Sequence, residues 1–84
     1  MSTDSEYKDL LVDAALLAVS VQRASVGLFN RRMSVSYVVA RRLLDDLEEL
    51  GIVSSTDGVG PRKTLVKTSD EALAVLKDMP MRHS

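Results

Sequence analysis

Two predicted helices that lie only a few residues apart are the feature that most restricts the fold of this chain. The first, over 25–32, begins with Ser25, whose side-chain oxygen can cap the free N–H groups of an opening helical turn. After a polar break, the second runs over 36–50, with Ser36 as its cap. It ends before Gly51, which suits the left-handed conformation that closes helices. Helix, short turn and helix is the arrangement of a helix-turn-helix unit.

The flanking segments predict one more helix on each side and a β-hairpin. A capping-box pattern near the start precedes apolar residues at helical spacing, which predicts a first helix over 4–20. A turn-rich loop between two short predicted strands, 52–54 and 63–67, predicts a hairpin, or wing, over 52–67. A last helix over 69–79 has Ser69 as its predicted cap. We therefore expect a mainly α fold with a small β-hairpin: a winged helix-turn-helix of three helices, a wing and a C-terminal helix.

The packing of these elements follows from their apolar positions. The 84 residues allow one core, so we expect a single domain over 1–84. The helix over 4–20 is apolar around much of its circumference, which is more than one contact face requires. The helix over 69–79 is a candidate cover, through Leu73, Leu76 and Met79 at near-helical spacing. A second copy of the chain or another protein at these two helices is the alternative cover.

Charge is segregated along the chain although the formal net charge is only −1. The stretch from Val21 to Arg42 holds arginines and no acid, namely Arg23, Arg31, Arg32, Arg41 and Arg42. Acids follow at 45–49, and the predicted wing then holds further cations. Association responds to the local field within about 10 Å at physiological salt, so a near-neutral protein can carry a positive binding surface. This distribution favours nucleic-acid binding.

The predicted helix over 36–50 separates a core stripe from a polar face. With about 100° between successive residues, the stripe centres on Leu47 and includes Ala40, Leu43, Leu44 and Leu50. The opposite side carries Val38, Arg41, Arg42, Asp45 and Glu49, with Tyr37 and Val39 at the margins. Partial core packing is the favoured interpretation of both Tyr7 and Tyr37, over base stacking. The pairs Arg41–Asp45 and Arg42–Asp46 have i,i+4 spacing, so a purely solvated helix face is the competing interpretation.

Other classes of function lack the residues that they need. The chain has no cysteine and one histidine, so we expect no disulfide, no metal site and no cofactor. No histidine or nucleophile is placed to work with the clustered acids, and we expect no enzymatic activity. The apolar stretch Leu10–Val21 is interrupted by Asp13 and Ser20, and the polar start lacks the basic region of a signal peptide. We therefore expect a cytoplasmic protein with no membrane contact.

A series of residues between Leu10 and Val66 matches the pattern of a known family. They are Arg23-Ala24-Ser25-Val26, Arg31-Arg32, Tyr37, Ala40, Arg42, Leu44-Asp45, Leu47-Glu48, Gly51-Ile52-Val53, Asp57-Gly58, Pro61-Arg62 and Leu65. On these the chain resembles the gamma domain of the FtsK/SpoIIIE DNA translocases, the C-terminal winged helix that reads short polar sequences on bacterial chromosomes and orients the motor. The resemblance implies this fold and double-stranded DNA binding. It does not extend to the motor, and leaves open a free-standing relative or a fragment of a translocase.

The departures from the family fall at its base-reading positions. The family usually has Gly-Tyr-Asn-Arg-Ala-Ala-Arg where this chain has Ser36-Tyr37-Val38-Val39-Ala40-Arg41-Arg42. Two valines thus replace the base-reading Asn and Arg, and Arg41 is a new arginine. In the wing the family's Arg-Glu becomes Arg62-Lys63, which removes an acid able to accept a hydrogen bond from cytosine. The resemblance therefore implies DNA binding without the family's target sequence.

These observations predict sequence-specific binding of double-stranded DNA, from a chromosome or a mobile element. The helix over 36–50 would enter the major groove and the wing would lie on the backbone. The expected contact residues are Arg31, Arg32, Ser36, Tyr37, Val38, Arg41, Arg42, Arg62 and Lys63. A protein-interaction module that uses Tyr37, Val38 and Val39 as its partner surface, or a small transcriptional regulator, is the alternative.

Overall fold

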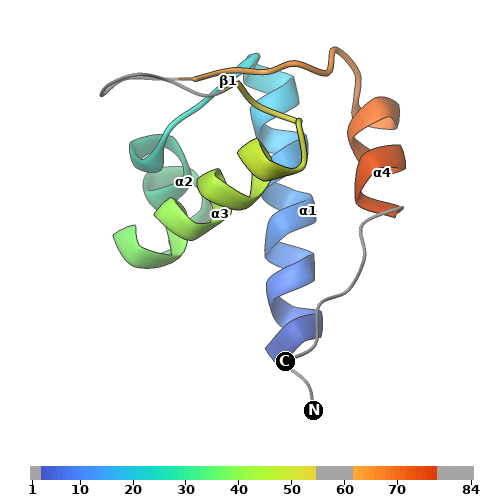
Figure 1. Ribbon diagram of the computed structural model, residues 1–84. Coiled ribbons are helices and arrows are strands. Elements are labelled where there is room, and N and C mark those ends of the chain that lie inside the picture. Colours follow the sequence, from blue (N-terminus) through green and yellow to red (C-terminus); the bar gives the residue numbers. More distant parts are fainter. Residues whose placement is uncertain (1–2, 55–61, 78–84) are drawn as a thin grey trace.

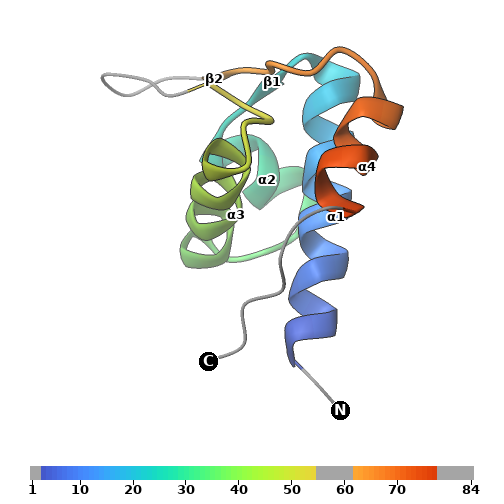
Figure 2. The same cartoon turned by 45° about the vertical axis from the view of Figure 1, so that its right-hand side comes forward.

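The computed structural model describes residues 3–54 and 62–77, which form four helices and a small two-stranded sheet (Figure 1). The elements are α1 (Thr3–Val21), β1 (Arg23–Ala24), α2 (Val26–Met33), α3 (Tyr37–Glu49), β2 (Arg62–Lys63) and α4 (Ser69–Lys77). The long helix α1 forms the centre, with α2 and α3 on one side and α4 on the other; Figure 2 shows the same arrangement after a 45° turn. Within 3–54 and 62–77, no helix is long and apolar enough to cross a membrane.

The helix-turn-helix forms where the serine caps predict it. The Oγ of Ser25 accepts a hydrogen bond from the N–H of Leu28 at 3.1 Å, and the Oγ of Ser36 accepts one from Val39 at 3.2 Å. Between the helices Ser34 takes a left-handed conformation with φ 56°, which ends α2. Gly51 has φ 81° directly after α3, the conformation expected of it. The bounds predicted for these helices therefore agree with the structure to within one residue.

The sheet differs from the predicted simple hairpin. Strand β1, immediately after α1, pairs antiparallel with β2, so that Arg23 faces Lys63 and Ala24 faces Arg62. The strand predicted after Gly51 is reduced to a single bridge between Val53 and Thr64. Its backbone is nevertheless paired, because Ser54 donates to the carbonyl of Lys63 at 2.8 Å. The predicted turn at Asp57-Gly58 lies outside the described residues.

The core gathers apolar side chains from all four helices and from the segment after α3. Phe29 of α2 is fully buried, as is Leu47, the predicted centre of the α3 stripe. Most of that stripe is confirmed, since Ala40, Leu43 and Leu44 are also buried, while Leu50 is only partly buried. Burial of this stripe against α1 and α2 fixes which side of α3 faces the solvent.

Helix α4 covers α1 as predicted, and Leu76 is buried as expected, but the buried face is partly different and so is the cap. Ala72 and Leu76 are the buried positions, whereas Leu73, predicted to face the core, is 41% exposed. The cap is Thr68, not Ser69: its Oγ1 accepts a hydrogen bond from the N–H of Glu71 at 3.2 Å. The Glu71 carboxylate in turn accepts from the N–H groups of Lys67 and Thr68, which completes a capping box one residue earlier than expected. Met79 and Pro80 lie outside the described residues.

Candidate nucleic-acid interface

The outward face of α3 begins with two large, unusually exposed side chains. Tyr37 is 63% exposed and Val38 is 79% exposed, and Arg41 and Arg42 are also exposed one turn later. Exposure of Val38 agrees with its predicted place opposite Leu47. The preference for core packing of Tyr37 is wrong, because this first residue of α3 projects beyond the part of the helix that packs on the core.

Arg41 and Asp45 form the i,i+4 ion pair that their spacing predicts. The Nε of Arg41 lies 3.5 Å from the Oδ1 of Asp45, and the two side chains are 67% and 52% exposed. A pair this exposed contributes about 0.3–0.5 kcal/mol, because water screens the charges and both side chains lose freedom. The guanidinium of Arg41 can therefore leave this pair for a phosphate or a base at little cost.

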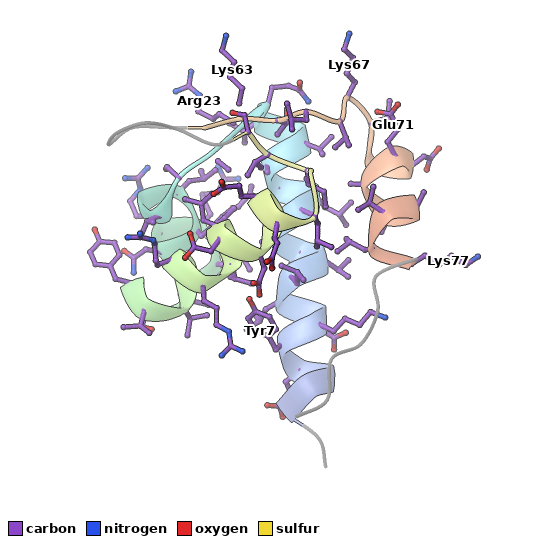
Figure 3. The ribbon with its side chains drawn as sticks, in the orientation of Figure 1. Tyr7, Arg23, Lys63, Lys67, Glu71 and Lys77 are labelled. Carbon is purple, nitrogen blue, oxygen red and sulfur yellow. The ribbon has the colours of Figure 1, made fainter. Side chains whose placement is uncertain are left out.

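Arg42 has a different environment. Its Cζ atom lies over the ring of Tyr7 on α1, 4.7 Å from the ring centroid, which is within the range of a cation–π contact. The Tyr7 hydroxyl donates a hydrogen bond to the carboxylate of Asp46. Tyr7 is half-buried against the core, as expected of it. Figure 3 shows Tyr7 on the side of α1 toward α3.

The Tyr7 hydroxyl is held in its protonated form. Partial burial raises its pKa well above the usual range, since the charged phenolate would lose solvation, and the hydrogen bond to Asp46 raises the pKa further. The positive charge of Arg42 opposes this shift without reversing it. Tyr7 is therefore a hydrogen-bond donor throughout the neutral range.

The remaining predicted contact residues lie around this face. Arg31 and Arg32 are exposed in the last turn of α2, and the capping Ser36 is exposed between the two helices. Lys63 is exposed on β2, next to Arg62 in the chain. The structure adds Arg23, which is exposed and faces Lys63 across the strand pair.

Arg23 and Lys63 both point away from the body of the molecule (Figure 3). Like charges placed opposite each other on a sheet are unfavourable, and an anionic partner would relieve that repulsion. In the sequence, Arg23 belongs to the acid-free basic stretch and to the family motif, and it was not predicted as a contact residue. Its partner was not predictable, because a two-residue strand carries no periodic signal.

Among residues 3–54 and 62–77, no group of His, Cys, Asp or Glu side chains is placed to hold a metal ion. The chemistry that this surface offers is that of guanidinium, ammonium, hydroxyl and apolar groups. These groups recognise phosphates and base edges by hydrogen bonds, charge and methyl contacts.

A helix-turn-helix followed by a short antiparallel wing defines a winged-helix domain. The family model described as "Ftsk gamma domain" matches residues 5–67, so the chain belongs to the FtsK gamma domain family. The resemblance expected from the sequence is thereby confirmed.

Proteins named DNA translocase FtsK are among the relatives of this chain. It is 43% identical over 67 residues to the protein of Chlorobaculum tepidum, 39% over 67 residues to that of Clostridium tetani and 36% over 63 residues to that of Caldanaerobacter subterraneus. The matches cover 75–80% of this chain but only 8–9% of these relatives, so the chain spans a small part of the proteins that it matches. No solved structure matches the chain.

Proposed function

We propose that this chain binds double-stranded DNA in a sequence-specific manner, with the first half of α3 in the major groove. One observation carries the proposal: the two turns from Tyr37 to Arg42 expose an aromatic ring, a valine and two arginines, with no acid before Asp45. The other side of the same helix is buried, so this is the face that α3 presents outward. Membership in a family of DNA translocase domains supports the same partner.

Within this arrangement we assign base reading to Arg41 and Val38. Arg41 is held by an exposed ion pair with Asp45, so its planar guanidinium can turn to the O6 and N7 atoms of a guanine. Val38 is the most exposed large apolar side chain described, and a thymine methyl group is an apolar feature within the major groove. Val38 stands where the family has its base-reading Asn, and Arg41 stands where the family has Ala, so the preferred sequence should differ accordingly.

Backbone contacts would come from the groups around α3. Arg31 and Arg32 lie in the last turn of α2, Arg42 lies on the side of α3 toward Tyr7, and Ser36 and Tyr37 offer hydroxyl groups at the start of α3. From the wing, Arg62 and Lys63 would lie on the adjacent sugar-phosphate backbone. Such contacts fix orientation and contribute affinity without reading sequence.

The acids at the far end of α3 would set the direction of docking. Asp45 and Glu49 are exposed on the same side of the helix as the arginines but nearer its C-terminus. Repulsion from phosphates would keep that end away from the duplex and leave the first two turns to enter the groove. A DNA-orienting role for a translocase, or for another factor acting on chromosomal or mobile-element DNA, is the process that we propose.

Fluorescence anisotropy with random-sequence duplex DNA across a range of salt concentrations tests this function. Each phosphate neutralised adds about 0.9 to the slope of log affinity against log salt, so several contacts give steeply salt-dependent binding. A pool selected from randomised duplexes should bind more tightly than the random pool. Absence of binding even at low salt would refute the proposal.

A protein-interaction module is the second candidate, and the exposure of Tyr37 and Val38 is the observation that favours it. An apolar interface responds little to salt, whereas phosphate contacts respond strongly. The same titration therefore separates the two functions. The alternative site for a second copy or another protein, on α1 and α4, is partly covered within the chain, because α4 packs against α1.

A further inference from the structure

A three-residue contact joins α1 to the recognition face of α3. The Arg42 guanidinium carbon lies 4.7 Å from the centroid of the Tyr7 ring, and the Tyr7 hydroxyl donates a hydrogen bond to Asp46. Tyr7 and Asp46 are 39 positions apart in the sequence, so this contact depends on the fold. Arg42 itself remains exposed.

Two groups, the Asp46 carboxylate and the Tyr7 ring, are placed to contact the Arg42 side chain. Asp46 lies four residues after Arg42, the spacing at which a carboxylate and a guanidinium on one helix pair with each other. Arg41 and Asp45, one residue earlier, do form that pair at 3.5 Å. Tyr7 gives Asp46 another partner and gives Arg42 an aromatic ring to pack against.

We propose that Tyr7 is a positioning residue that holds Arg42 ready to contact a phosphate of the bound duplex; this inference rests on the proposed function. A free arginine loses side-chain freedom when it binds, and that loss weakens the complex. A guanidinium that already lies over an aromatic ring has lost part of that freedom in the free protein. A guanidinium has five N–H donors, more than one tyrosine can accept, so donors remain available to an anion.

Arg42 lies on the side of the outward face nearer α1, away from Arg41. This placement suits a contact between Arg42 and the sugar-phosphate backbone at the edge of the major groove. In the proposed complex, Arg41 and Val38 would face the base edges within the groove. We therefore expect Arg42 to strengthen binding to duplexes of every sequence. Tyr7 is expected to increase the affinity that Arg42 contributes.

A double-mutant cycle in duplex binding tests the inference, with Tyr7→Leu, Arg42→Ala and the double variant compared with the parent. Arg42→Ala is expected to weaken all duplexes equally and to reduce the salt slope by about 0.9, the value of one phosphate contact. Tyr7→Leu is expected to weaken binding by roughly two- to tenfold, the range for ordering one long side chain. In the Arg42→Ala background the same Tyr7 change is expected to have no effect.

Two further variants separate positioning from folding. Val12→Ala removes part of another half-buried α1 side chain and is expected to lower thermal stability while leaving DNA affinity unchanged. Tyr7→Phe keeps the ring and loses the hydrogen bond to Asp46, and so remains informative if Tyr7→Leu does not fold. It is expected to weaken binding by a smaller factor than Tyr7→Leu, again only when Arg42 is present.

The outcomes are distinguishable. Equal losses from the Tyr7 changes with and without Arg42 would show a merely structural role and overturn the inference. An Arg42→Ala variant with the parent's affinity and salt slope would also overturn it. A parent chain that binds no duplex would refute the proposed function itself, before the cycle is measured.

Discussion

Replacing Arg41 with alanine is expected to separate DNA recognition from stability. This side chain forms a 3.5 Å ion pair with Asp45, in which both partners are more than half exposed. Its loss should lower the free energy of unfolding by no more than about 0.5 kcal/mol. If Arg41 binds a guanine edge, the variant should lose about 1–3 kcal/mol of binding free energy at the preferred sequence. That range corresponds to a roughly 5- to 150-fold rise in Kd.

The assay is anisotropy with the selected duplex and with single-base variants of it, alongside urea unfolding of the same protein samples. Arg41→Lys is the matched control, because lysine keeps the charge but not the planar two-donor edge. It should retain the salt slope and lose discrimination at one base pair. Lys63→Ala, by contrast, should weaken every duplex about equally. An Arg41→Ala variant with unchanged affinity and base preference would refute the assignment of Arg41.

Three further expectations concern stability and are measurable by urea or thermal unfolding. Leu47→Ala, at a fully buried position, should cost about 2–5 kcal/mol, while Leu73→Ala should cost less than about 1 kcal/mol. Thr68→Ala should cost about 1 kcal/mol and Ser69→Ala less than about 0.5 kcal/mol; the reverse order would contradict the cap assignment. The raised pKa of Tyr7 means that the folded protein holds the hydroxyl proton more tightly than the unfolded chain does. The contribution of Tyr7 to the free energy of unfolding is therefore complete below pH about 10 and declines above it. Tyr7→Phe should remove that part of the alkaline decline, and an identical decline in both proteins would contradict the argument.

The parts of the fold that the sequence predicted are those that depend on local signals. Ser25 and Ser36 cap their helices because each is a short polar residue directly before an apolar helical pattern. The faces of α3 follow from the helical period alone, and the buried positions of Leu43 and Leu47 agree with it. Gly51 has the positive φ that helix ends favour.

The features that the sequence did not predict depend on contacts between distant residues. Strand β1 is too short to show a pattern, and it exists because β2 lies beside it. The i,i+4 spacing offers Arg42 the same type of partner as Arg41, but the ring of Tyr7 reaches it from another helix. The choice of Thr68 over Ser69 depends on where Glu71 can reach back, since two adjacent hydroxyl residues are equally able to cap. Exposure of Tyr37 depends on how far α3 extends beyond the core.

The most direct test of the central claim is an NMR titration of the ¹⁵N-labelled chain with the selected duplex. The account predicts that the largest amide shift changes lie over 36–42, with smaller changes at the end of α2 and at Lys63, and that α4 is unaffected. Changes concentrated on α4 or the exposed side of α1, or no changes at all, would contradict a DNA-reading role for α3.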